Sequence, residues 1–139
     1  MRTTRCLNPF NMKKLLLLVG ALLSTLVTYS QIQYHATEVS QRSFDSQQRL
    51  IKGPFKPVSV PTIINLYNNA LTVRGDREIS VKFVRKTNMI DKDGSSYILY
   101  KGLESDRDEC SIIINDYGTY SRIGIYWPKS NFMLVYQTM

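Results

Sequence analysis

The side chains best suited to catalysis are scarce in this chain of 139 residues. His35 is the only histidine, and Cys110 is one of two cysteines. A nucleophilic cysteine or serine needs an imidazole held within hydrogen-bond reach, whereas His35 lies close to the N-terminus that we predict for the mature chain, where backbones are poorly ordered. Zinc takes several Cys and His ligands. The residues therefore predict no catalytic site, no metal site and no cofactor.

Carboxylates offer a second route to chemistry, as a general acid and base or as oxygen ligands for calcium. They gather in the segment Asp91-Lys92-Asp93-Gly94 and in the trio Asp106, Asp108 and Glu109. The first group matches only the start of an EF-hand loop, because no Glu stands at its twelfth position and no helix is predicted beside it. We expect a hairpin turn there, closed by a glycine in the left-handed conformation.

Aromatic side chains supply the one hint of a binding surface. Rings with a polar end suit half-wet surfaces and flat ligands such as sugars or partner proteins. The alternative is that tyrosine is simply a favoured strand residue on a sheet with one solvent-exposed face. The candidate ligand-binding residues all lie in the C-terminal third with Trp127, and they are Tyr97, Tyr100, Tyr117, Tyr120 and Tyr126.

The elements that must position these residues are strands, because apolar residues recur at every second position. This alternation is clearest in Val58–Leu66, Ile79–Phe83 and Ile123–Trp127. Turn residues such as Asn68-Asn69 separate the runs and favour hairpins. Further strands are expected at Tyr97–Tyr100, at Ile112–Ile114 and at Phe132–Gln137. Adjacent strand residues face opposite sides, so we expect Trp127 to point inward with Ile123 and Ile125, and Tyr126 to point outward.

Short strands joined by short turns, with no crossover helix, predict an all-β fold. We expect an antiparallel meander of about six to eight strands that forms a small sandwich or an up-and-down barrel. In this layout the chain resembles the small lipocalin-like secreted proteins. Their Gly-x-Trp signature on the first strand is missing, since the only tryptophan lies near the end, in Gly124-Ile125-Tyr126-Trp127. The apolar-ligand function of that family is therefore unsupported.

Two further segments precede the β-rich domain, which we assign to residues 58–139. Residues 31–57 are rich in Gln and Ser and predict a polar arm with a possible first strand at Tyr34–Phe44. The competing interpretation is an arm that is ordered only by a partner. Residues 1–30 predict a signal peptide, with Met12 as an alternative start.

The predicted signal peptide has the usual three parts. Lys13 and Lys14 precede an apolar run from Leu15 to Leu23, and small residues lead to a predicted cut between Ser30 and Gln31. The run is shorter than the roughly 20 apolar residues that a membrane-spanning helix needs, so no transmembrane protein is expected. We expect export to the periplasm or the medium of a Gram-negative bacterium.

Removal of the leader changes the charge of the protein. The chain carries 18 Lys and Arg against 11 Asp and Glu, whereas residues 31–139 hold 14 and 11, for a net charge of +3. Only Lys82, Arg85 and Lys86 form a modest basic cluster, which argues against nucleic-acid binding. Cys110 is the only cysteine after the predicted cut, so no intramolecular disulfide is possible.

Three classes of function stay open on this basis. The first is a non-catalytic binding or accessory module of the cell envelope, whose partner is a carbohydrate, an apolar small molecule or an envelope protein. The second is a structural or interaction protein that docks to an envelope partner. An enzyme is the third and the least favoured class, because no catalytic arrangement is visible in the sequence.

Overall fold

The computed structural model describes one unit of the chain, residues 31–139. The predicted signal peptide, with its cut after Ser30 and the alternative start at Met12, lies outside the described residues. Within residues 31–139 no helix is long and apolar enough to cross a membrane.

Nine antiparallel strands in one sheet make up this unit, which confirms the all-β prediction. A 3-10 turn, η1 (Pro128–Ser130), stands between the last two strands, and the described residues contain no α-helix. The strands are β1 (Ile32–Phe44), β2 (Leu50–Lys52), β3 (Lys56–Leu66), β4 (Ala70–Arg74), β5 (Ile79–Ile90), β6 (Ser96–Glu104), β7 (Glu109–Asp116), β8 (Ser121–Trp127) and β9 (Phe132–Thr138).

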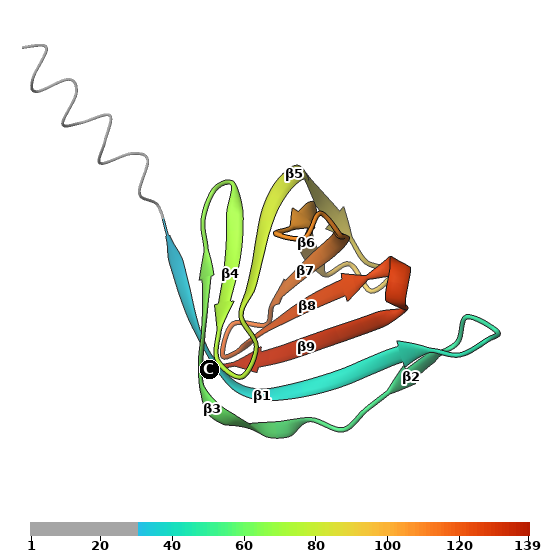
Figure 1. The fold of residues 1–139 in the computed structure, drawn as a ribbon, viewed down its shortest axis with the longest axis horizontal. Coiled ribbons are helices and arrows are strands. Elements are labelled where there is room, and N and C mark those ends of the chain that lie inside the picture. Colours follow the sequence, from blue (N-terminus) through green and yellow to red (C-terminus); the bar gives the residue numbers. More distant parts are fainter. Residues whose placement is uncertain (1–30) are drawn as a thin grey trace, which may run out of the picture. The chain divides into compact units, whose positions relative to one another are not determined.

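The strand order is that of a meander whose two ends meet at β1. Neighbours in the sheet follow the order β2-β1-β3-β4-β5-β6-β7-β8-β9, and β1 also pairs with β9. The N-terminal part of β1, residues 32–39, pairs with β3, and the C-terminal part, residues 36–43, pairs with β9 (Figure 1). The strand foreseen at Tyr34–Phe44 thus begins at Ile32 and is hydrogen-bonded on both sides.

Three strands are longer than the short strands that the sequence predicts. β1 has 13 residues, β3 has 11 and β5 has 12. Register shifts interrupt β1 between Ala36 and Glu38 and β5 between Phe83 and Arg85. An extra residue at a bulge changes which side chains face the core, so alternation that is read from the sequence stops at the bulge although the strand continues.

The core fills one face of the sheet with alternate residues of successive strands. Trp127 packs against this core at its margin, in register with buried Ile123 and Ile125, as expected. In β7, Ile112 and Ile114 are buried, whereas Ile113 is half-buried on the opposite face. The largest completely buried apolar side chains are Ile64, Leu71, Val73, Val81, Ile112, Ile123, Ile125 and Leu134.

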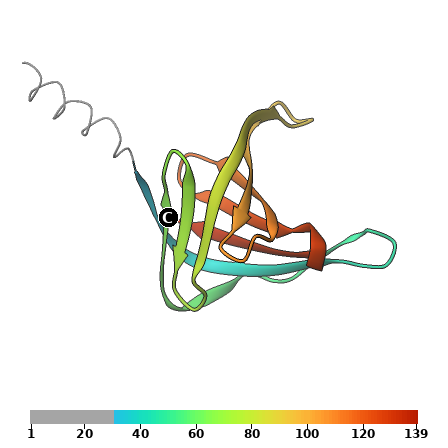
Figure 2. The same cartoon turned by 45° about the horizontal axis from the view of Figure 1, so that its top comes forward.

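The predicted turns form where Asn, Asp and Gly occur. Gly94 (φ 85°) and Gly118 (φ 87°) adopt the left-handed conformation that other residues rarely tolerate. Two hairpins, β1–β2 and β5–β6, extend beyond the other strands (Figure 2). They carry apolar side chains that water reaches, among them Ile51 and Ile90.

Candidate functional site

The five candidate tyrosines do not share one surface. Tyr100 is buried in the core, where its ring stacks on Phe83 with centroids 4.2 Å apart. Tyr97 lies on the same strand, β6, an odd number of positions away, and it therefore faces the opposite side of the sheet. Alternation along β6 separates the two rings.

Tyr126 makes local contacts on the outer face of the sheet. Its ring meets Phe44 edge to face at 5.3 Å, and its hydroxyl donates a long hydrogen bond of 3.4 Å to Asn131 Oδ1. Tyr126 thus faces away from the core, as expected from its register beside Trp127.

Tyr117 and Tyr120 are the two candidates that the structure brings together. Their rings stack at 5.0 Å across the β7–β8 turn. The turn is fixed by a backbone hydrogen bond from Tyr117 N to Tyr120 O of 2.9 Å, and by Asp116 Oδ1, which accepts from Gly118 N at 2.9 Å. Tyr117 is 48% exposed. A ring pair in a rigid turn therefore faces solvent.

Arg122 joins this ring pair to a third ring, Phe55, from the loop between β2 and β3. Its Cζ lies 4.8 Å from the centroid of Phe55, 5.8 Å from that of Tyr120 and 6.0 Å from that of Tyr117. Its Nε donates to Gln137 Oε1 at 3.3 Å. These contacts fix the guanidinium by cation–π attraction and one polar contact.

Arg42 of β1 approaches the same Phe55 ring at 5.6 Å. Burial and the nearby Arg122 lower the pKa of Arg42 from its ordinary value. The loop that carries Phe55 is anchored next to β1, since Gly53 N donates to Gln41 O and Ser40 Oγ donates to Gly53 O. We call Arg42, Phe55, Tyr117, Tyr120 and Arg122 the arginine–aromatic cluster.

A second group of rings lies at the other end of the strands. Trp127 stacks on Phe132 at 5.9 Å, and its Nε1 donates to Glu104 Oε2 at 2.9 Å. Arg77, from the β4–β5 loop, lies 5.5 Å from the Phe132 centroid. Because Trp127 and Phe132 also pack on the core, their first role is structural.

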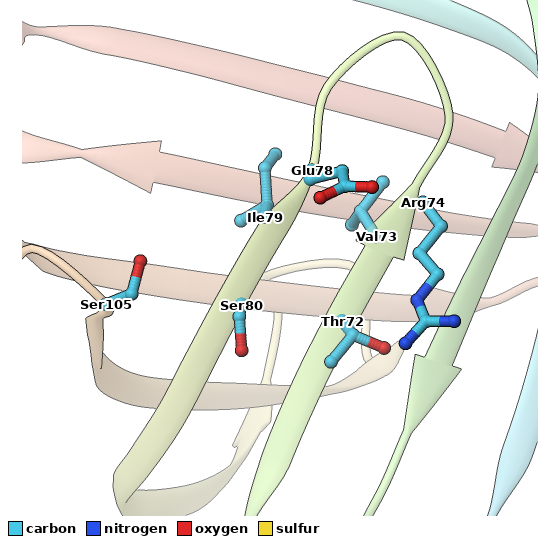
Figure 3. Close-up of a pocket in the computed structure, with 7 residues that line it drawn as sticks. All are labelled: Thr72, Val73, Arg74, Glu78, Ile79, Ser80 and Ser105. Carbon is cyan, nitrogen blue, oxygen red and sulfur yellow. The ribbon is translucent and has the colours of Figure 1, made fainter.

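A hollow of about 290 Å³ lies beside the β4–β5 hairpin (Figure 3). Its charged groups, Arg74 and Glu78, have opposite signs, and no aromatic ring lines it. The hollow is therefore neither a hydrophobic pocket nor a site whose charged groups all have the same sign. The remaining lining residues are Thr72, Val73, Ile79, Ser80 and Ser105.

Cys110 is buried and free. Burial, with smaller contributions from Glu104 and Asp106, raises the pKa of its thiol to about 11. The thiol is therefore protonated at neutral pH, and a protonated thiol is a poor nucleophile.

The carboxylates around Asp91 close a hairpin turn, as expected. Asp93 Oδ1 accepts from both the backbone N and the hydroxyl of Ser95, and these hydrogen bonds lower the pKa of Asp93. In the second acidic group, Asp106 Oδ1 accepts from Asp108 N at 3.1 Å. Residues 31–139 contain no cluster of three or more His, Cys, Asp or Glu that could hold a metal ion, and His35 lies exposed on β1.

Sequence reasoning missed Phe55, Arg42 and Arg122 as site residues. The sequence signal for Phe55 was weak: Gly53-Pro54 marks a turn next to an aromatic residue, but no local pattern places that turn beside β8.

Comparisons with family models, with curated proteins and with solved structures return no match for the chain.

Proposed function

We propose that this chain is a small exported binding module of the cell envelope without catalytic activity. We further propose that its sheet is an up-and-down barrel of the lipocalin-like kind. Two observations support the barrel: β1 pairs with both β3 and β9, and the buried residues of successive strands share one face. Closure would remove the open edges that sheets otherwise have to protect.

The observation that carries the binding proposal is the arginine–aromatic cluster. Tyr117 and Tyr120 form a stacked pair at a rigid turn, and Tyr117 is about half exposed. A solvent-facing ring pair supplies contact area at a small cost in side-chain entropy. Arg122 beside it supplies directional hydrogen-bond donors. Flat ligands with polar edges, such as sugars, fit this combination.

The experiment is a ligand panel on the exported protein, recovered in folded form. The panel contains neutral and acidic monosaccharides, palmitate and a solubilised envelope fraction, with binding followed by saturation-transfer NMR and, for the fraction, by co-purification. We expect saccharide binding that falls about thirtyfold or more in the Tyr117→Ala/Tyr120→Ala double variant, because central aromatic residues contribute more than about 1 kcal/mol each. Tyr67→Ala is the matched control, since this half-buried ring lies in the β3–β4 turn, and β1 and β9 separate β3 from β8 in the sheet.

Retention of binding by the double variant would contradict this choice of site. Turnover of any bound saccharide would contradict the non-catalytic proposal. Binding of palmitate and of no saccharide would mean that the ligand is an apolar small molecule and not a sugar.

A second candidate function, docking to an envelope protein, is favoured by the exposed apolar residues of the extended hairpins. Val84 and Ile90 on β5 are 74% and 78% exposed, and Leu50 and Ile51 of β2 are also exposed. Exposed apolar groups of this kind mark interaction sites when they are close together. Co-purification from the envelope fraction that is lost in Ile90→Ser, with saccharide binding absent, would favour this function over the first.

Export itself gives a direct prediction. The basic, apolar and small-residue order of residues 12–30 is that of a cleaved leader. The intact mass of protein recovered from the periplasm or the medium should correspond to a chain that begins at Gln31. A recovered product that still contains residues 15–27 would contradict cleavage.

A further inference from the structure

Two positive charges in the arginine–aromatic cluster lack a counter-ion. The Cζ atoms of Arg42 and Arg122 lie 5.6 Å and 4.8 Å from the centroid of the same ring, Phe55. The two ion pairs in residues 31–139 are Arg49–Asp45 and Lys129–Asp108, and neither involves the cluster. Two like charges beside the same ring repel each other. An anion bound beside both guanidinium groups would be attracted to each of them and would offset this repulsion.

Glu38 is the carboxylate whose register brings it toward the pair. It lies opposite Gln137 on β9, and Gln137 in turn lies opposite Arg122 on β8. Gln137 therefore stands between the carboxylate and the guanidinium, and it accepts the hydrogen bond from Arg122 Nε. An amide carries no net charge, so the positive charge of Arg122 is left uncompensated.

The hydrogen-bond donors of Arg122 are only partly used. Nε donates to Gln137, and within residues 31–139 the two Nη groups donate no hydrogen bond. A guanidinium presents its donors in a planar fork that matches the paired oxygens of a carboxylate or a phosphate. The three rings around Arg122 restrict its motion, so less side-chain entropy is lost when an anion binds.

The stacked tyrosines extend the surface next to these donors. Arg122 lies within 6.0 Å of both ring centroids, and the pair faces solvent through Tyr117. An apolar face of a pyranose ring can pack on such rings, while an anionic substituent of the same sugar reaches the guanidinium groups. A free inorganic anion would use only the charged part of this surface.

We propose that the arginine–aromatic cluster binds an acidic saccharide, a pyranose that carries a carboxylate or a phosphate. The inference rests on the proposed binding function and narrows its ligand class. Arg122 holds the anionic group, Arg42 adds to the positive potential, and Tyr117 and Tyr120 hold the ring. Neutral sugars lack the charged contact, and inorganic phosphate lacks the ring contact.

The test measures binding of four probes to the folded exported protein at low ionic strength, by NMR titration. The probes are glucuronate, glucose 6-phosphate, glucose and inorganic phosphate. We expect both acidic sugars to bind at least about tenfold more tightly than glucose, because hydrogen bonds to charged groups contribute about one such factor. Both should also exceed inorganic phosphate, and their relative affinities distinguish the carboxylate from the phosphate source.

Two variants and a matched control complete the design. Arg122→Gln should lower affinity for the acidic sugars about tenfold or more, and Arg122→Lys should retain charge but lose the fork and give an intermediate loss. Arg85→Gln removes an equal charge from an exposed position on β5 and should leave binding unchanged. Melting curves for each variant separate loss of the site from loss of the fold, and Arg42→Gln provides an independent change if Arg122→Gln does not fold.

The outcomes separate this inference from the function on which it rests. Equal binding of glucose and glucuronate that is insensitive to Arg122→Gln would overturn the acidic class, yet leave a saccharide-binding module in place. An acidic peptide, tetraglutamate, is titrated in the same way as a fifth probe. Binding of this peptide with no binding of either acidic sugar would overturn the inference in favour of a protein partner. Absence of binding to every sugar, together with no loss in the Tyr117→Ala/Tyr120→Ala variant for any other ligand, would overturn both.

Discussion

Replacement of Trp127 by alanine is expected to lower the free energy of unfolding by about 3 kcal/mol, at the lower end of the range for large aromatic truncations. The indole packs on the core, stacks on Phe132 at 5.9 Å and donates to Glu104 Oε2 at 2.9 Å. Its removal leaves a gap at the margin of the core and deprives the Glu104 carboxylate of a donor. Urea denaturation followed by circular dichroism measures the difference.

Tyr126→Ala is the matched control on the opposite face of the same strand. Its ring makes an edge contact with Phe44 and a long hydrogen bond to Asn131, so we expect a loss of about 1 kcal/mol. A larger loss for Tyr126 than for Trp127 would mean that the two faces of β8 are assigned the wrong way round.

The general fold was predictable because alternation is a local property of the sequence. Runs such as Val58–Leu66 and Ile123–Trp127 reveal both the strand and its buried face, and Asn-, Asp- and Gly-containing segments reveal the turns. The pattern fails at the bulges. After Ala36 the core-facing set shifts, so β1 reads as an irregular polar segment although it pairs with both β3 and β9.

The position of β1 in the sheet could not be read from composition. Ser40 is completely buried, and its hydroxyl is satisfied because it donates a hydrogen bond to Gly53 O at 2.6 Å. A buried serine with its hydrogen bond satisfied looks, in the sequence, the same as a serine in a solvated arm. Only the long-range pairing with Gly53 distinguishes the two.

The candidate site was only partly predictable for a related reason. Tyr117 and Tyr120 are close in the sequence and share one turn, so local reasoning finds them. Tyr97 and Tyr100 are separated by the same three positions, but they lie within one strand, where alternation turns Tyr100 toward the core and Tyr97 toward the opposite face. Phe55 and Arg42 reach Arg122 through the pairing of β1 with β9 and of β9 with β8, which no local pattern specifies.

Gly102→Ala is expected to destabilise the protein by about 1–3 kcal/mol, the range for overpacking a well-filled core. A Cβ at this position would lie 2.5 Å from the carbonyl O of Lys82 and 2.7 Å from Val81 Cγ1. Lys82 pairs with the neighbouring β6 residue Leu103, so its carbonyl cannot retreat without disturbing the β5–β6 ladder. This clash outweighs the gain of about 0.4–1 kcal/mol that alanine gives by restricting the unfolded chain.

Gly124→Ala provides the control, because the same substitution there meets a movable neighbour. The nearest atom to the added Cβ would be Met133 Cε, at 2.6 Å, and the next lie 3.9 Å away. Met133 can change rotamer, since its side chain is unbranched and flexible, so we expect the free energy of unfolding to change by less than about 1 kcal/mol. Thermal or urea unfolding of both variants measures the two losses in stability. Equal losses would mean that the β5 backbone moves to accommodate a Cβ as readily as the Met133 side chain does. The close approach of β5 and β6 at Gly102 would then not constrain the fold.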